Sequence, residues 1–156
     1  MGDLRMAAWR AFLEAHARVT TLLEEDLQRE RGLSLAWYDV LVQLEEAEGH
    51  RLRMTELARR VVISKSGLTR LVDRMVEAGL VTRCLDDQDR RGRWVEMTPA
   101  GFERLRDAAP RHLRGVRQYF TSELDEQSAG VLAHVLGRIA AKAAAELAAR
   151  ESRRGR

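Results

Sequence analysis

The chain has 156 residues, of which 45% are hydrophobic and 33% are charged. This length supports one domain with a hydrophobic core, but it is short for two independent domains. The net charge is only +3, so total charge does not by itself indicate nucleic acid, and the local distribution of charge must do so. Of the 27 basic residues, 25 are arginine and the other two are Lys65 and Lys142.

The sequence contains no sign of export or of a membrane anchor. Its first ten residues, MGDLRMAAWR, lack the apolar segment of a secretory signal, and no apolar run approaches the length of a membrane span. The single cysteine, Cys84, cannot form an intrachain disulfide. We therefore expect a cytoplasmic protein with a reduced thiol and no membrane partner.

Two long amphipathic helices are predicted at the ends of the chain. Apolar residues recur at steps of three and four from about Gly2 to Arg31, and Gly32 is the expected stop. A last helix is predicted from about Asp125 to Arg150, followed by a frayed tail. Each helix has an apolar stripe that the small centre of the chain cannot cover, so we expect a partner subunit; pairing of the two helices within a monomer is the alternative.

The segment from Met54 to Gly101 is the most informative part of the chain. Ser34 is the expected N-cap of the helix that precedes it, Thr55 of a short helix, and Ser64 of a second helix that ends at Gly79. Two strands, Leu80–Leu85 and Arg93–Thr98, should follow as a hairpin. Thr98 and Pro99 then begin a helix that runs to about Phe120. A polar helix fits a major groove, and an arginine-tipped hairpin fits a minor groove.

The first two helices of this segment carry candidate DNA contacts. A recognition helix needs small or hydrogen-bonding side chains at its N-terminal end. Arg70 is the best candidate for reading a base, because an arginine fork matches guanine; a solvated arginine is the alternative. Gly67 either permits a close approach to DNA or is tolerated near a helix end. The predicted contacts are Thr55, Ser64, Lys65, Ser66, Gly67, Thr69, Arg70 and Arg74, with Lys65 and Arg74 on phosphates.

The pattern LRMTELARRVVISKSGLTRLVDRMVEAGLVTR, followed by DDQDRRGRWVEMTPAG, resembles the MarR family of bacterial winged-helix transcription regulators. The segment LSLAWYDVLVQL resembles the second helix of that family. The most specific feature is the wing signature, Asp-x-Arg before a strand that ends in hydrophobic-Thr, which reads Asp89-Arg90-Arg91-Gly92 and Met97-Thr98 in this chain.

The resemblance implies a mainly α fold with a small β wing. A single domain would span residues 1–156, with a winged helix-turn-helix at residues 34–104 and dimerisation helices at residues 1–31 and 105–156. It also implies an obligate homodimer on a pseudo-palindromic DNA operator, usually as a repressor. Many members respond to a small aromatic or phenolic effector.

The wing is expected to carry four contacts. Arg91 is the predicted tip residue, because a guanidinium suits the negative potential of a minor groove. Asp89 could hold that side chain through a charge-assisted bond, a pairing that the family pattern supports. Arg90 and Arg93 would then contact flanking phosphates. A solvated cluster of charges is the alternative interpretation.

An effector site is predicted where the first, second and fifth helices meet. Its candidate wall residues are His16, Trp37 and His112, with Arg53 as a partner for an anion; the alternative for each, an ordinary core or surface residue, is the commoner case. Cys84 is expected to be a small buried side chain and not a redox sensor. The four histidines lack metal-site spacing, so neither a metal nor a cofactor is expected.

An enzyme is not expected, because the chain has no glycine-rich phosphate loop, no nucleophile elbow and no credible pair of carboxylates. Two other classes stay open beside a specific regulator. One is a winged-helix module that binds protein, and the other is a non-specific architectural DNA binder.

Overall fold

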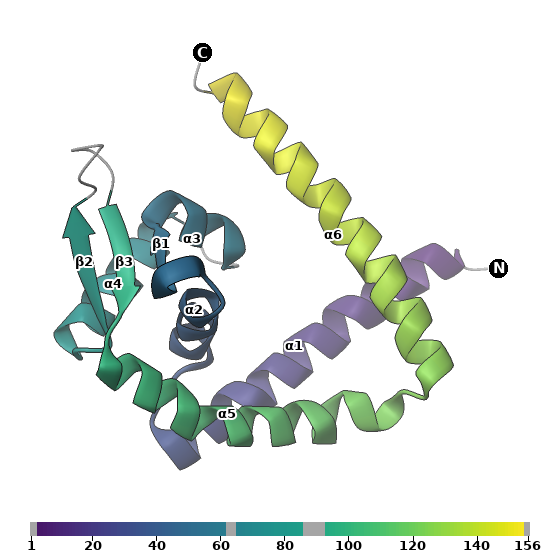
Figure 1. Ribbon diagram of the computed structural model, residues 1–156. Helices are drawn as coiled ribbons and strands as arrows, with labels where there is room; N and C mark the ends of the chain where they lie inside the picture. The colour runs from purple at the N-terminus through teal and green to yellow at the C-terminus, as the bar shows by residue number, and fades with distance from the viewer. Residues whose placement is uncertain (1–2, 62–64, 86–92, 155–156) are drawn as a thin grey trace. The chain divides into compact units, whose positions relative to one another are not determined.

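The computed structural model describes residues 3–61, 65–85 and 93–154 (Figure 1). The chain forms two compact units, Met1–Val116 and Arg117–Arg156. The first unit contains, in chain order, α1 (Leu4–Arg31), α2 (Leu35–Glu45), β1 (Arg51–Arg53), α3 (Met54–Arg60), α4 (Lys65–Glu77), β2 (Val81–Leu85), β3 (Arg93–Met97) and most of α5 (Pro99–Tyr119). The second unit contains α6 (Glu126–Arg154). The predicted class, mainly α with a small β wing, is confirmed.

The core of the first unit lies between helices α2 to α5 and one face of the sheet. Its side chains are mostly leucine and valine, which fill the space between helices without leaving polar atoms to satisfy. The eleven largest fully buried side chains are Leu27, Leu33, Leu41, Leu44, Leu57, Leu68, Met75, Val40, Val72, Val81 and Val95. They come from every element of this unit except β1 and α5, so the helix-turn-helix and the hairpin share one core.

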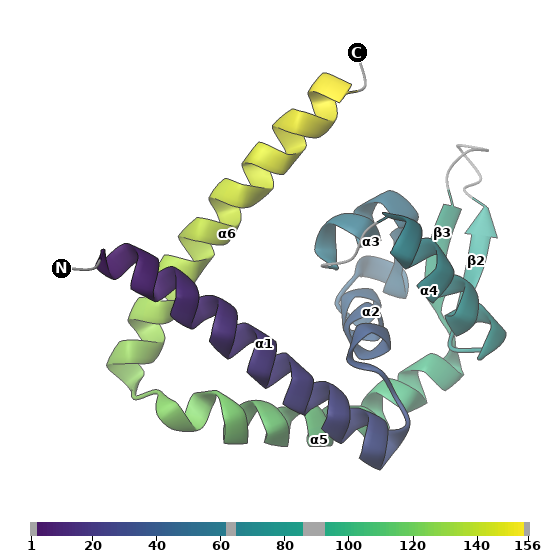
Figure 2. The same ribbon diagram turned by 180° about the vertical axis from the view of Figure 1, so that it is seen from behind.

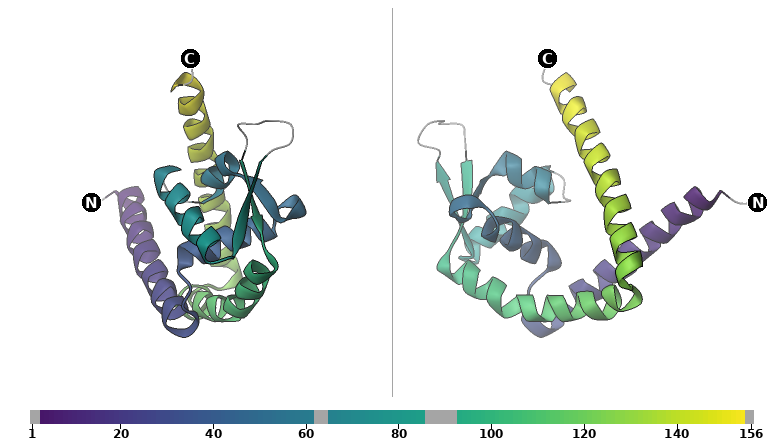
Figure 3. Two further views of the ribbon diagram at one scale, coloured as in Figure 1. Left: turned by 90° about the vertical axis from the view of Figure 1, so that its left-hand side faces the viewer. Right: turned by 45° about the vertical axis from the view of Figure 1, so that its right-hand side comes forward.

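The sheet has three strands and not the two that the sequence predicted. All pairings are antiparallel in the order β1-β3-β2, with Leu52 opposite Val95 and Cys84 opposite Trp94. Strands β2 and β3 form the hairpin seen from two sides in Figure 3. Strand β1 was missed because Arg-Leu-Arg is too short to show an alternating pattern, and only its pairing with β3 makes it a strand.

Two further boundaries differ from prediction. Thr55 is not an N-cap: α3 begins at Met54, and its N-cap position, Arg53, makes no side-chain capping bond. The reason is that β1 runs directly into α3, so the backbone of Arg53 already has an extended conformation. At the other end, α6 continues to Arg154, because its alanine-rich sequence favours helix past the predicted end at Arg150.

The predicted caps of α2 and α5 are confirmed. The Ser34 hydroxyl accepts a hydrogen bond from the backbone N–H of Trp37 (3.2 Å), and the Thr98 hydroxyl accepts one from Gly101 (3.0 Å). The Glu24 carboxylate of α1 adds a second cap by accepting from the backbone N–H of Leu35 (2.6 Å). Free N–H groups and the helix dipole both favour an anion there, so Glu24 fixes the angle between α1 and α2.

The start of α5 lies against the backbone that leads into β2. A Cβ atom added to Gly101 would come within 2.2 Å of the backbone oxygen of Leu80. The Thr98 hydroxyl also donates to the backbone oxygen of Gly79 (2.7 Å). Only a glycine at position 101 permits this close approach, which holds α5 against the end of the hairpin.

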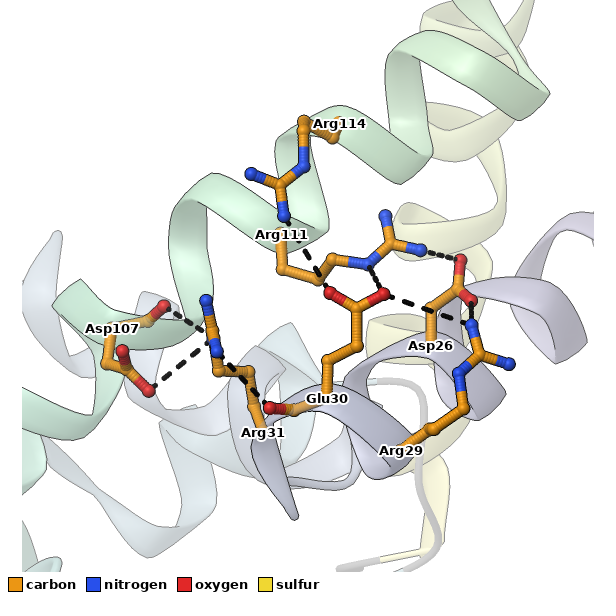
Figure 4. Close-up of polar contacts among 7 residues, drawn as sticks. All are labelled: Asp26, Arg29, Glu30, Arg31, Asp107, Arg111 and Arg114. Atoms are coloured by element: carbon orange, nitrogen blue, oxygen red, sulfur yellow. Dashed lines mark hydrogen bonds and ion pairs between the residues drawn. The ribbon is translucent and has the colours of Figure 1, made fainter.

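A largely buried ion cluster joins α1 to α5 (Figure 4). Figure 2 shows the two helices that it connects. The guanidinium of Arg111 pairs with both Asp26 and Glu30, and its Nε lies 2.7 Å from Glu30 Oε1. The side chains of Arg111 and Asp26 are only 9% and 8% exposed. Arg29 pairs with Asp26 at 2.5 Å, and the exposed Arg114 lies 3.7 Å from Glu30. A charge at such depth is tolerated only with its partners in place.

A second contact between these helices lies about two turns of α5 away. Nη2 of Arg104 donates to the backbone oxygens of Arg31 (2.5 Å) and Gly32 (3.0 Å). These carbonyls belong to the C-terminal end of α1, where the oxygens have no partner within the helix. A cation also suits the negative end of the helix dipole. Arg104 therefore caps α1 from α5, and together with Arg111 it fixes the register of the two helices.

We expect Arg111→Met to lower the free energy of unfolding by about 3–5 kcal/mol, because it leaves the buried Asp26 carboxylate without its main partner. The double variant Asp26→Leu/Arg111→Met should recover most of that loss, since it removes both charges. The measurement is urea unfolding at fixed protein concentration. The control is Arg114→Met, an exposed member of the same cluster that should cost less than about 1 kcal/mol. An equal cost for Arg111→Met and Arg114→Met would contradict this account.

Candidate nucleic-acid interface

Helix α4 has one buried face and one exposed face, as a recognition helix requires. The buried side chains are Leu68, Leu71, Val72 and Met75, and they recur at the helical spacing that the sequence predicted. On the opposite face Thr69, Arg70 and Arg74 are exposed. A hydroxyl and two guanidiniums on one side of a helix offer donors to a groove or to a phosphate backbone.

Arg83 of β2 holds α4 against the hairpin. Its Nη1 lies 2.5 Å from Asp73 Oδ1, and its Nη2 donates to the backbone oxygen of Thr69 (3.3 Å). The Arg83 side chain is three-quarters buried, so the pair is less screened by solvent than a surface ion pair. The free face of α4 and the hairpin are therefore held in one arrangement.

This contact joins two residues that the sequence did not single out. Asp73 lies on the polar side of α4, and its side chain is 47% exposed while it pairs with Arg83. Arg83 itself was not expected to matter. The only signal in the sequence was an arginine in a strand that follows a helix with an acid on its polar face, and that signal is too common to be used alone.

The structure places the other predicted DNA contacts unevenly. Thr55 is exposed in the first turn of α3, Gly67 is half-buried in the first turn of α4, and Arg93 is exposed as the first residue of β3. Lys65 and Ser66 are the first two residues of α4. Four predicted contacts lie outside the described residues: Ser64, Asp89, Arg90 and Arg91.

This arrangement of helices and hairpin has close counterparts among known proteins. A family model described as MarR family matches residues 31–92. The solved structure of AbsC, a MarR family transcriptional regulator from Streptomyces coelicolor, is 39% identical with a TM-score of 0.83, covering 91% of this chain and 95% of that one. The chain belongs to the MarR family. The solved members named here are transcription regulators.

Two more relatives carry information in their names. Sco3205, a MarR family regulator from Streptomyces coelicolor solved in complex with DNA, is 34% identical with a TM-score of 0.83, covering 90% of this chain and 91% of that one. The transcriptional repressor YetL of Bacillus subtilis is 34% identical over 97 residues, which are 62% of this chain and 58% of that protein. The match therefore spans little more than half of the length of that curated repressor.

The residues predicted for an effector site lie beside different neighbours. The ring of His16 on α1 is 6.2 Å from that of Phe12, and the guanidinium of Arg53 lies over the Trp94 ring of β3. Trp37 is half-buried against the core of this MarR-family chain. The described contacts do not bring these residues to one site.

His112, the fourth candidate, packs on α2. Its ring lies 4.4 Å from that of Tyr38 (centroid to centroid), and its buried Nδ1 has no hydrogen-bond partner among the described residues. Burial lowers the pKa of His112 and raises the pKa of the Tyr38 hydroxyl, because both charged forms are disfavoured away from water. The native protein therefore holds this imidazole in its neutral form.

Two general features of the described residues bear on other site classes. No group of three His, Cys, Asp or Glu side chains in the described ranges could hold a metal ion. Within the same ranges, no helix is both long and apolar enough to cross a membrane.

Cys84 is half-buried, not fully buried as expected, and its Sγ lies 3.5 Å from Glu96 Oε2.

We expect the MarR-family chain to lose stability as the pH falls below about 6.5, the pKa of an unperturbed histidine. Between that value and the lowered native pKa of His112, the unfolded chain binds more protons than the native one, so the free energy of unfolding rises with pH. His112→Phe keeps a ring against Tyr38 and removes the titration. Urea unfolding at pH 7.5 and 5.5 should show a smaller loss for this variant. Equal losses in both proteins would refute the assignment.

Proposed function

We propose that this chain is a homodimeric, sequence-specific DNA-binding repressor that reads a pseudo-palindromic operator. Helix α4 would enter the major groove, and the loop between β2 and β3 would enter the adjacent minor groove. The observation that carries the proposal is the exposed polar face of α4, which the Arg83–Asp73 pair joins to the hairpin. A related regulator, Sco3205, has been solved with DNA, and YetL is named a repressor.

The roles of individual residues follow from their positions and from the family pattern. Arg70 would read a base, and Thr69, Ser66 and Ser64 would contact base edges or sugars near the start of α4. Lys65 and Arg74 would hold phosphates. In the wing, Arg91 would enter the minor groove with Asp89 as its partner, and Thr55, Gly67, Arg90 and Arg93 would complete the contacts with the backbone.

The proposal of a dimer rests on apolar surface at both ends of the chain. On α1, Trp9 and Phe12 are 51% and 42% exposed, although their rings lie only 6.0 Å apart. On α6, taken alone, Val131 and Ile139 are 60% and 59% exposed. A contiguous apolar face of this kind marks a protein interface. We propose that residues 1–31 and 105–156 bind the same helices of a second copy, and that residues 34–104 read DNA.

A dimer gives an effector a way to act. A ligand can release the operator only by favouring one spacing of the two reading regions over another. To move the population from 1:99 to 99:1, it must bind the favoured state better by about 5.5 kcal/mol. We propose a small aromatic or phenolic effector near His16, Trp37 and His112, with Arg53 as an anion partner; the resemblance to the family supports this class of ligand.

The test of the function is to select DNA from the organism's own genome with the purified protein. We expect a site with two related half-sites whose centres are about 10 bp apart. A site with one half only would contradict the dimer. Equal affinity for the selected site and random DNA would instead indicate an architectural binder. An affinity for DNA with no salt dependence would indicate a module that binds protein.

We expect Arg70→Ala to relax the base preference of the protein by about 1–3 kcal/mol at one position of each half-site, because a bidentate contact to a base is lost. Arg74→Ala, one helical turn further along the same face, is the matched control. It should weaken binding to operator and random DNA equally. Competition binding with single-base variants of the operator measures both. Equal losses on operator and random DNA for Arg70→Ala would make it a phosphate contact.

We expect Arg91→Ala to weaken operator binding strongly while the dimer stays intact, because it removes a proposed minor-groove contact and changes no residue of the proposed dimerisation helices. The measurement combines gel-shift affinity at moderate salt with light scattering for the mass in solution. Arg10→Ala, which removes an exposed arginine of α1, should leave the affinity unchanged. If Arg91→Ala binds as tightly as the wild-type protein, the wing has been assigned wrongly.

A further inference from the structure

A proline interrupts α5 halfway along its length. Pro110 lies inside the helix, and its side chain is exposed. Because a proline has no backbone N–H, the backbone oxygen of Arg106 loses its usual hydrogen bond within the helix, and the ring bends the helix away from its own side. Arg106 is also exposed, so water can satisfy this oxygen. The helix is therefore weakest at residues 106–110, which we call the proline joint.

The C-terminal end of α1 contacts α5 on both sides of the proline joint and at the joint itself. Before the joint, Arg104 donates to the backbone oxygens at the end of α1. After it, the buried Arg111 pairs with Glu30 through its Nε (2.7 Å). Between these two contacts, Nε of Arg31 donates to the backbone oxygen of Asp107 (3.2 Å; Figure 4). One end of α1 thus spans the weakest part of α5.

Arg31 makes the contact that acts on the proline joint directly. Its Nε also lies 3.6 Å from Asp107 Oδ2, so one guanidinium faces both the backbone oxygen and the carboxylate of the same residue. That backbone oxygen directly follows the one that Pro110 leaves without its helical partner. Backbone oxygens tilt when a helix bends, so a side chain that holds one of them resists a change of bend. Arg31 belongs to the last turn of α1, whose register Arg111 already fixes.

We propose that Arg31 is a positioning residue that holds the proline joint at one bend. The first half of α5 is held against the hairpin at Gly101, and its second half belongs to the proposed dimerisation helices. A free joint would let the reading region take several orientations relative to those helices, and an operator would then select one of them at a cost in affinity. Arg31 avoids this cost without touching DNA. The link to the operator rests on the proposed function, while the effect on the joint does not.

The first experiment measures amide hydrogen exchange of the full chain without DNA. Arg31→Gln removes the guanidinium and should speed exchange of the amides of residues 111–114 about fivefold. Pro110→Ala supplies the missing N–H and should slow exchange of the same amides. In the Pro110→Ala background, Arg31→Gln should change their exchange by less than about twofold, because a continuous helix keeps its bend without the side chain. The amides of α2 are the internal reference and should exchange alike in all four proteins.

The second experiment measures affinity for the selected operator, with light scattering for the mass in solution. Arg31→Gln should weaken binding about fivefold, and Pro110→Ala/Arg31→Gln should bind within about twofold of Pro110→Ala alone. A role in overall stability alone predicts the same fold change in both backgrounds, and that result in either experiment would overturn the inference. A loss of the dimer in Arg31→Gln would also overturn it, because the joint would not be the cause. If the wild-type protein binds no duplex, the proposed function fails, and the exchange measurement still decides whether Arg31 holds the joint.

Discussion

The buried pair of Asp26 and Arg111 is the contact on which the arrangement of the first unit depends. It joins α1 to α5, which begins directly after the hairpin. The N-terminal half of α1 is exposed. A hydrophobic contact at this place could slide by a methylene group at little cost. A buried ion pair cannot, because any shift separates charges that have lost their water. The cluster therefore gives α1 and α5 one register, which Arg104 reinforces at the C-terminal end of α1.

Close contacts of this kind also link α5 to the proposed DNA-reading face of α4. Gly101 brings the first turn of α5 against Leu80, which directly precedes β2. Within β2, Arg83 pairs with Asp73 and so joins the strand to α4. Each step is a short contact between neighbouring elements with one favoured geometry. A change in the angle of α1 would therefore be carried to α4 by displacement of a packed unit and not by bending within it. In the proposed dimer, the proposed effector would act through such a displacement to alter the spacing of the two reading regions.

Local chemistry made much of this fold readable from the sequence. The caps at Ser34 and Thr98 and the stop at Gly32 follow from one or two residues each, and the buried stripe of α4 follows from its period. What escaped was non-local. Strand β1 exists only because β3 lies beside it. The burial of Arg111 depends on two acids that lie more than eighty positions earlier in the chain. A single sequence gives no reason to pair residues so far apart.

The candidate DNA site divides in the same way. The exposed face of α4 could be predicted from its polarity, but the pairing of Asp73 with Arg83 could not, because the two residues belong to different elements. The effector candidates were chosen by residue type and by the expected meeting of the first, second and fifth helices, and the structure gives them different neighbours. Residue type indicates what a side chain can bind, while only packing decides which side chains can bind the same molecule.

The excess of arginine over lysine takes on a structural meaning in this light. Arg111 binds two carboxylates in the interior, Arg104 caps two carbonyls, and Arg83 bridges an acid and a backbone oxygen. Each role uses several N–H groups of one planar fork, which a lysine ammonium cannot reproduce with the same geometry. These three positive charges thus hold elements of the fold together. The net charge therefore says little about DNA binding, and the arginines that matter there are those that the fold leaves exposed beside α4 and the hairpin.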